Sequence, residues 1–385
     1  MGKRELLLVV AFVAVGALVY QLTAPPAQAG EQSFSISRVI ESLRRHARGN
    51  RASAEITSQA TYPLASGTNE LRIPTSFRAQ SLTITGEDRS DIAAELHVWS
   101  NGYDDAEAQD LAKQTKLTPV EGAGSLSMGI FYPDPGQQRA NVVLKVPSRI
   151  RIQVAAYGGR LEITGTTEVE LLNTRGEAEV KEISGRVSGT HRNGDLKISD
   201  IESLKLTTRG TDVRLAKIHG AATIQAQAGE LRGSEIDGPL DVDTNATDIT
   251  FEQLGKAKGP IRVTAVAGSI TMRGVASDVR IDARNAEVEV VMDKAAPVAI
   301  YNEGNDPITL TPPPTGYALD LLATTGGRIR LPDGVLEVKS DQSEERAAGS
   351  VHGGGPTITL RANRGDIVIR TPDAPKAHEG SGAQR

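Results

Sequence analysis

Acidic side chains recur at a fixed spacing through the middle of the chain. They are Glu177, Asp195, Asp212, Glu230 and Asp248, and each stands just before an apolar residue. If the segments that carry them stack side by side, like charges face one another, and a row of calcium ions held by carboxylate oxygens would relieve the repulsion. The alternative is a row of turn residues neutralised by nearby basic side chains, namely Lys197, Arg214 and Arg232. We favour the turn residues and predict no metal site.

A second group of charged residues is suited to sugar chemistry. It consists of Asp241, Asp243, Asp248 and Arg262, which are expected to point outward from two successive repeats. Polysaccharide hydrolases need clustered carboxylates, and lyases need a base beside the acidic carbon of the sugar. Acids at alternate positions are also expected on the solvated face of any strand. Because aromatic residues make up only 3% of the chain and few rings could stack on sugars, we predict that the protein has no catalytic residues and is not an enzyme.

Other motifs that carry chemistry are missing from the sequence. The chain has no cysteine, which excludes disulfides, cysteine-based zinc sites and cysteine nucleophiles. Its histidines are scattered singly without zinc spacing, and His191 and His219 are expected at turns. Nucleotide-binding glycine loops and serine-nucleophile motifs are absent. We therefore predict no cofactor.

The elements that carry these residues follow a repeat of short alternating segments. NGDLKIS at 193–199 and AGSITM at 267–272 show the pattern. The first apolar residues of the copies are Leu161, Ala178, Leu196, Val213, Leu231, Ile249, Ile270, Val288, Ile308, Ile329 and Ile367. Because strand residues alternate between two faces, these aliphatics would form an inward ladder. We predict an all-β chain whose residues 147–371 form a parallel β-solenoid of about eleven short rungs.

The regions that flank the repeats differ in pattern. Residues 52–146 alternate less regularly, and the segment 105–115 follows an acidic N-cap at Asp104. This pattern predicts a small irregular β-rich cap region with one helix. The polar stretch 340–356 interrupts the last repeat interval and predicts a loop insertion. The tail 372–385 lacks an apolar pattern and is predicted to be disordered.

The N-terminus has the pattern of an export or membrane segment. A positively charged start precedes a long apolar run, and residues 6–22 would cross a membrane if they are retained. A site of small residues ending at Ala29 fits signal-peptide cleavage. Residues 1–30 are therefore predicted to be a signal peptide or a hydrophobic anchoring helix. Residues 31–51 predict a basic amphipathic helix or linker, which either rests on a membrane surface or caps the solenoid.

The charge balance argues against a nucleic-acid partner. The formal net charge is −5, with both signs mixed along the chain. Proteins that bind nucleic acids concentrate basic residues on one face or one segment. We predict no nucleic-acid binding.

One stretch resembles a known family. VVLKVPSRIRIQVAAYGGRLEITG, at 142–165, has a strand ending in Val146-Pro147, a further strand, and then glycine-containing two-strand repeats. It resembles the bacterial “putative adhesin” family of unknown-function domains built from β-strand repeats, and the resemblance covers roughly residues 50–371. The resemblance implies an extracytoplasmic β-solenoid without an established activity, and it transfers no catalytic residues.

These features together predict a binding role. The leading hypothesis is a non-catalytic, adhesin-like or scaffolding protein of the bacterial cell envelope, either exported or anchored through residues 6–22. Its partner would be an envelope component or another protein. Two alternatives stay open at this point. One is a carbohydrate-active β-helix enzyme, a polysaccharide lyase or hydrolase, and the other is an envelope-stress accessory protein that acts through a membrane partner.

Overall fold

The computed structural model describes residues 52–372. The predicted signal peptide or anchor at 1–30, the predicted helix at 31–51 and all but the first residue of the predicted tail at 372–385 lie outside the described residues. The described chain is all-β, and its strands belong to one large sheet. Between residues 52 and 372, no helix has the length and apolar character needed to cross a bilayer.

The elements follow one another in a simple order along the chain. They are β1 Ala52–Pro63, β2 Glu70–Ile73, β3 Ser81–Glu87, β4 Asp91–Gly102, α3 Asp105–Gln114, β5 Lys116–Gly122, β6 Ser125–Phe131, β7 Gln138–Pro147, β8 Arg151–Ala155, β9 Arg160–Thr164, β10 Glu168–Ile218, β11 Ala222–Ile236, β12 Leu240–Glu252, the 3-10 helix η1 Leu254–Lys256, β13 Ile261–Val275, β14 Val279–Met292, β15 Val298–Gly304, β16 Ile308–Thr311, β17 Tyr317–Thr324, β18 Ile329–Arg330, β19 Lys339–Asp341, β20 Glu344–Val351, β21 Thr357–Arg364 and β22 Ile367–Ile369.

The described residues divide into two compact units. The smaller unit contains residues 98–115 and 132–139 together with the start of β1. The larger unit contains residues 57–97, 116–131 and everything described from Ala140 onward. The predicted division after residue 146 coincides with none of these boundaries.

The smaller unit contains the predicted helix, which the structure confirms as α3. Asp104 is its N-cap, and the Asp104 carboxylate accepts a hydrogen bond from the Glu107 N–H at 2.9 Å. The Glu107 carboxylate accepts one from the Tyr103 N–H at 2.6 Å. These two bonds satisfy backbone donors that the first helical turn leaves without partners. Ala108 and Ala112 form the buried side of the helix.

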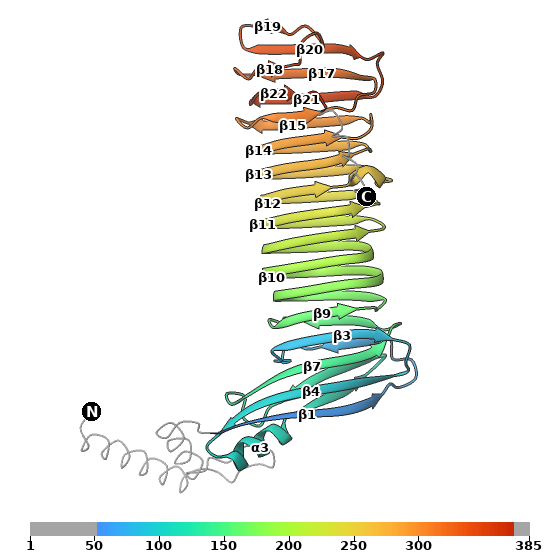
Figure 1. The fold of residues 1–385 in the computed structure, drawn as a ribbon, viewed down its shortest axis with the longest axis vertical. Helices are drawn as coiled ribbons and strands as arrows, with labels where there is room; N and C mark the ends of the chain where they lie inside the picture. The colour runs from blue at the N-terminus through green and yellow to red at the C-terminus, as the bar shows by residue number, and fades with distance from the viewer. Residues whose placement is uncertain (1–51, 373–385) are drawn as a thin grey trace, which may run out of the picture. The chain divides into compact units, whose positions relative to one another are not determined.

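The aliphatic residues aligned in the sequence lie beside one another in the larger unit. The strands β11, β12 and β13 lie side by side (Figure 1). In their parallel ladders Leu231 pairs with Ile249, and Ile249 pairs with Ile270. The same register continues through Val288 and Ile308. All five side chains are buried, because alternate residues of a strand face the same side. The predicted inward ladder is confirmed for these strands.

The extended segments bend at residues with left-handed backbone geometry, and many of these residues are not glycine. One series stands shortly before the ladder aliphatics and contains Asn193, Ala228, Ala246, Ala267 and Asn285, with φ between 52° and 62°. A second series contains Glu182, Asp200, Lys217, Glu235 and Gln253. Such geometry costs a residue with a Cβ roughly 1–2 kcal/mol. It persists where the packing of the surrounding strands determines the bend.

The last strands do not follow chain order. Ile308 pairs with Ile367, and Ile329 also pairs with Ile367, so β22 lies between β16 and β18. In the same way β21 lies between β15 and β17. The sequence alignment placed Ile329 directly after Ile308, and that prediction is wrong. The three isoleucines fit the ladder equally well, and only the path of the chain decides which are neighbours.

The predicted loop at 340–356 is largely a strand, so this prediction is also wrong. β20 pairs antiparallel with β17 along its whole length, and β19 pairs with β20 (Figure 1). Ala347 and Val351 are buried, and the residues between them face outward or are half-buried. Since β21 occupies one edge of β17, β20 covers the other edge. An edge strand exposes much of its surface to water, which gives it the polar composition of a loop.

Two strands near the start of the chain are also inserted out of order in the larger unit. Leu71 of β2 pairs with Leu126 of β6 and with Ile152 of β8. Leu82 of β3 pairs with both β7 and β9, where its partner is Leu161. Part of the region predicted to be an irregular cap therefore continues the parallel register of the repeats.

Candidate functional site

A polar groove lies on the outward surface of β10, β11 and β12. Its volume is about 430 Å³, and its outward side chains come in pairs two residues apart. The pairs are Thr190 and Arg192, Thr207 and Arg209, Gln225 and Gln227, and Asp243 and Asn245. The residue between two members of a pair is buried, as for Thr208, Ala226 and Thr244. The alternation of strand residues therefore builds the groove from outward positions of successive strands.

The members of these pairs form two parallel columns across the strands, one through Thr207, Gln225 and Asp243 and one through Arg209, Gln227 and Asn245. A second hollow continues both columns. It has a volume of about 210 Å³ and is lined by Thr264, Val266, Asp282, Arg284, Tyr301 and Glu303. Asp243 pairs with Thr264, and Thr264 pairs with Asp282. Asn245 pairs with Val266 in the parallel column. We call the two hollows together the column groove.

The β10–β12 half of the column groove carries charged side chains that have no partner of opposite charge among the described residues. Arg192, Arg209 and Asp243 are exposed. In the part of the chain that the structure describes, none of the three forms an ion pair. Amide groups of Gln225 and Gln227 lie between the arginines and the aspartate along the strand order. The Thr207 hydroxyl donates a long hydrogen bond to Gln225 Oε1 at 3.5 Å. The charged groups of Arg192, Arg209 and Asp243 stay available to an external molecule.

The other half of the column groove is internally neutralised. Asp282 accepts hydrogen bonds from Arg280 Nε at 2.8 Å and Nη2 at 3.0 Å. The Arg280 guanidinium also lies 5.1 Å from the centre of the Tyr301 ring, within cation–π range. Arg284 contacts the Glu303 carboxylate at 3.2 Å. The two halves therefore share one geometry and differ in available charge.

The five recurring acids of the sequence pattern lie outside the column groove lining, and three of them contact arginines. The pairs are Glu177 with Arg160 at 3.7 Å, Asp195 with Arg214 at 3.4 Å, and Glu230 with Arg232 at 2.6 Å. The contacts of Arg214 and Arg232 agree with the interpretation of these acids as neutralised turn residues. Exposed pairs of this kind contribute little stability each, but they offset the repulsion between neighbouring acids.

The other two acids bind the backbone of the next strand. Asp212 Oδ1 accepts a hydrogen bond from the Glu230 N–H at 3.1 Å. Asp248 Oδ1 accepts one from the Ser269 N–H at 3.0 Å and one from the Ser269 hydroxyl at 2.8 Å. Asp366 repeats the contact. The sequence pattern did not reveal this capping role, and within residues 52–372 no three His, Asp or Glu side chains gather as a metal-binding group.

The candidate sugar-site residues divide between two surfaces. Asp241 lies in register beside Arg262, and Asp243 lines the column groove. Asp248 lies beyond the next turn, where its carboxylate holds the backbone of the neighbouring strand. The structure therefore brings Asp241, Asp243 and Arg262 to one outward face and gives Asp248 a structural role. This arrangement does not favour the three-carboxylate site of a polysaccharide hydrolase or lyase.

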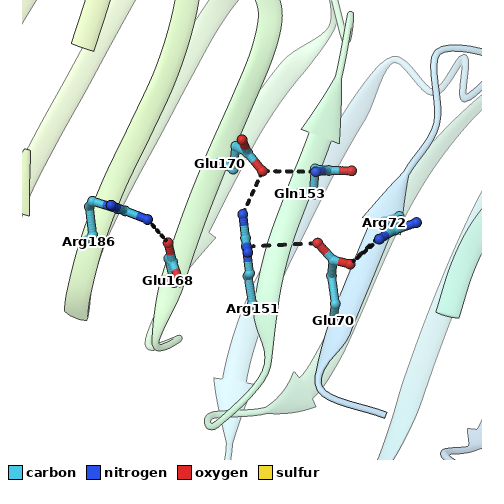
Figure 2. A network of polar contacts seen from close by, with 7 residues as sticks. All are labelled: Glu70, Arg72, Arg151, Gln153, Glu168, Glu170 and Arg186. Carbon is cyan, nitrogen blue, oxygen red and sulfur yellow. Dashed lines mark hydrogen bonds and ion pairs between the residues drawn. The ribbon is translucent and has the colours of Figure 1, made fainter. Parts of the chain in front are cut away.

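A network of charged side chains joins β2, β8 and β10 (Figure 2). Arg151 contacts Glu170 at 2.7 Å and Glu70 at 3.8 Å. Gln153 donates a hydrogen bond to Glu170 at 2.9 Å, and Arg72 contacts Glu70 at 2.6 Å. The network links strands that are distant in sequence, so its role is to fix their register.

Glu170 makes the stability of this network depend on pH. The hydrogen bond from Gln153 and the charge of Arg151 lower the pKa of Glu170. A lowered folded-state pKa means that the carboxylate stabilises the fold above its unfolded-state pKa, and the contribution is lost as the pH falls through the folded-state pKa. We expect Glu170→Gln to lower the free energy of unfolding by about 0.5 to 1 kcal/mol at neutral pH. Urea unfolding should show the difference shrinking in acid.

The control for this prediction is Glu252→Gln, at the exposed end of β12. That variant should unfold at the same urea concentration as the native chain at either pH. Equal stability of Glu170→Gln and the native chain at neutral pH would contradict the assigned role of the network.

His191 is a buried polar residue among the aliphatics of β10. Its side chain has no exposure, and Nδ1 lies 3.0 Å from the Thr174 hydroxyl while Nε2 lies 3.2 Å from the Gly176 carbonyl oxygen. The carbonyl accepts from an Nε2–H, and the hydroxyl donates to Nδ1, which corresponds to the neutral ring. Burial lowers the pKa of His191, although the Gly176 carbonyl and Asp195 oppose this shift. Asn193, two residues on, has φ 54°, so His191 lies just before a turn.

Protonation of His191 is expected to destabilise the protein in acid. Because the folded-state pKa is below the unfolded-state value of about 6.5, the unfolded chain binds the proton more readily. Stability therefore falls as the pH drops through about 6.5, and levels off below the folded-state pKa. His191→Gln should remove this slope. Urea unfolding midpoints measured between about pH 5 and 8 check it.

His219 supplies a control of opposite sign. Its exposed ring lies 2.9 Å from Asp200, and this hydrogen bond raises the pKa of His219. The stability that it contributes is present at low pH and is lost as the pH rises through the folded-state pKa. His219→Gln should thus leave the acid destabilisation in place. The assignment to His191 is wrong if His191→Gln and the native chain show the same slope.

Comparison with known proteins gives distant structural likenesses. No protein-family model matches the chain, and no curated protein does. A “putative cell adhesion protein” from Clostridium sporogenes has 9% sequence identity and a TM-score of 0.20, with 83% of this chain and 100% of the other covered. A “putative adhesin” from Parabacteroides merdae has 9% identity and a TM-score of 0.31, with 64% and 94% covered. A “putative lipid binding protein” from Parabacteroides distasonis has 9% identity and a TM-score of 0.30, with 65% and 94% covered.

Proposed function

We propose that this chain is a non-catalytic, adhesin-like binding protein of the bacterial cell envelope, and that the column groove is its binding surface. The observation that carries the proposal is the exposed, unpaired state of Arg192, Arg209 and Asp243 in a groove built from regular strands. Polar groups that stand on regular strands and are free of internal partners can meet a ligand without breaking existing contacts.

The proposed scaffold is a parallel β-solenoid. Leu240 pairs with Ile261 and Ile261 pairs with Val279, with the same offsets between strands as the ladder of Ile249 and Ile270. Both stretches of one repeat thus lie on the corresponding stretches of the next. Single repeats of this size bury too little apolar surface to fold alone, so stacking supplies the core. In a stack of this kind, the outward residues at one position of each repeat form a continuous column along the stack.

The proposed location is outside the cytoplasm. The apolar segment at 6–22 and the small-residue site at Ala29 support export, with the segment either cleaved or kept as a single-pass anchor. Fractionation of bacteria that produce the full chain tests this location. Recovery of the chain from the cytoplasmic fraction alone would contradict it.

The binding proposal is tested with variants that fill the groove. Gln225→Trp places a large side chain in the column groove at an exposed strand position, where aromatic residues are compatible with β structure. Lys197→Trp makes the same change at an exposed position of β10 that does not line the groove. Co-sedimentation with isolated bacterial envelopes should fall at least about tenfold for Gln225→Trp, equivalent to about 1.4 kcal/mol, and should be unchanged for Lys197→Trp. Equal binding by both variants would overturn the proposal.

A further inference from the structure

The backbone of the column groove is already occupied by the sheet. β11 pairs with β10 on one side and with β12 on the other, and β12 pairs in turn with β13. An extended peptide gains much of its affinity by adding a strand to a free sheet edge. Between β10 and β13 no such edge lies in the groove. A ligand there must be recognised by side chains alone.

The side chains of the groove suit a ligand rich in hydroxyl groups. Amides of Gln225, Gln227 and Asn245 each offer both donors and acceptors, and Thr190 and Thr207 add hydroxyls. Sugar hydroxyls also donate and accept, so the two sets are complementary. Apolar contact is limited, because Val266 is the one large apolar side chain of the described groove that is exposed, at 39%. This lining favours a glycan over a hydrophobic protein surface.

Arg192 and Arg209 add a preference for negative charge. Thr211 Oγ1 approaches the His191 carbonyl oxygen at 3.5 Å, which places the segments that carry the two arginines beside each other. A guanidinium group binds a carboxylate through two parallel hydrogen bonds. Neighbouring strands are about 4.8 Å apart, which is close to the length of one sugar residue in an extended chain. The strand positions of the two arginines are therefore about one sugar residue apart along such a chain.

We propose that the column groove binds a linear acidic glycan of the polyuronate type, with carboxylates of neighbouring sugars held by Arg192 and Arg209. This proposal rests on the binding function proposed above. The sugar chain lies across the strands, along the columns that lead from β10 towards Tyr301. The acids Asp282 and Glu303 are paired with arginines in the far half, so a negative chain meets little uncompensated repulsion there. In the near half the lining holds one carboxylate, Asp243, against the two arginines.

Calorimetric titration of the purified full chain tests the ligand class. The probes are short and long oligogalacturonates and their carboxyl-reduced, neutral counterparts. The acidic oligomers should bind at least about tenfold more tightly than the neutral ones, with affinity rising with length. Arg192→Gln combined with Arg209→Gln should weaken acidic binding by a similar factor and abolish the preference. The matched control is Arg214→Gln combined with Arg232→Gln, whose arginines pair with acids outside the groove, and it should bind like the native chain.

The outcomes separate this proposal from the one on which it rests. Equal binding of acidic and neutral oligomers, or equal loss in the control variant, would overturn the acidic-glycan ligand. Envelope binding that is lost in Gln225→Trp, together with no binding of either the acidic or the neutral oligomers, would also overturn the acidic-glycan proposal. It would leave the proposed binding function standing. If Gln225→Trp binds envelopes as the native chain does, the groove is not the binding surface and both proposals fail.

Discussion

Replacing Gly194 by alanine is expected to lower the free energy of unfolding by about 3 kcal/mol, through backbone strain and overpacking together. Gly194 has φ 140°, a conformation that residues with a Cβ rarely adopt. The added Cβ would also lie 2.7 Å from the carbonyl carbon and 2.9 Å from the Cα of Gly176. Both atoms belong to backbone held within β10, so neither can move aside cheaply. Urea unfolding followed by circular dichroism measures the loss.

The control for this prediction is Gly326→Ala. Gly326 also has a left-handed backbone, with φ 88°, but a Cβ there would meet no atom within 4 Å. Strain alone should cost about 1 kcal/mol. The difference between the two variants thus reports the close approach of neighbouring segments at Gly194. Equal destabilisation by both would mean that this close approach is absent.

Loss of the β19–β20 hairpin is expected to make the protein self-associate. Replacing residues 339–351 by glycine and serine keeps the chain length but removes the strand that covers β17. The uncovered edge would present its backbone N–H and C=O groups, flanked by Leu319 and Leu321. Exposed edges of this kind pair with other chains. Size-exclusion chromatography with light scattering should show dimers or larger species at concentrations where the native chain shows fewer.

A smaller change tests whether β20 is the covering element. Replacing only residues 339–341 removes β19, while β20 stays on β17. That variant should have the same mass distribution as the native chain. If the larger replacement also leaves the distribution unchanged, β20 does not protect the edge.

The sequence predicts the register of the repeats because burial selects for it. Leu231, Ile249 and Ile270 recur at the inward position of successive strands, and the structure pairs them as aligned. The order of the last strands could not be predicted in this way. Ile308, Ile329 and Ile367 carry the same inward signal, and their order depends on the return of the chain through β20.

Turns and edges were harder to predict than the core. Asn193 and Asn285 are residue types that tolerate the left-handed conformation, whereas Ala228, Ala246 and Ala267 give no such signal. The sequence predicts a loop at 340–356, because the strand that lies there at 344–351 has few apolar residues. Ala347, Gly349 and Val351 are small or apolar and stand two residues apart, and this spacing indicates one side of a strand.

The column groove was missed because its residues form no motif along the chain. Thr207, Gln225 and Asp243 are far apart in sequence and are common surface types. They become neighbours only when outward positions are aligned by the register of the aliphatics. Applied to the outward residues, that alignment would have found the columns from sequence. The hydrogen bonds of Asp212 and Asp248 to backbone N–H groups, in contrast, depend on side-chain geometry that no alignment shows.

The most direct test of the column groove as the binding surface uses the absence of cysteine from the chain. Gln227→Cys places one thiol in the groove, and Lys197→Cys places one at an exposed position of β10 outside the groove lining. The rate of thiol alkylation is measured for each variant with and without isolated bacterial envelopes. Bound envelopes should slow the reaction of the Gln227→Cys variant at least about tenfold and leave the Lys197→Cys variant unchanged, because only the groove is covered. Protection of the Lys197→Cys variant without protection of the Gln227→Cys variant would contradict the assignment of the groove as the binding surface.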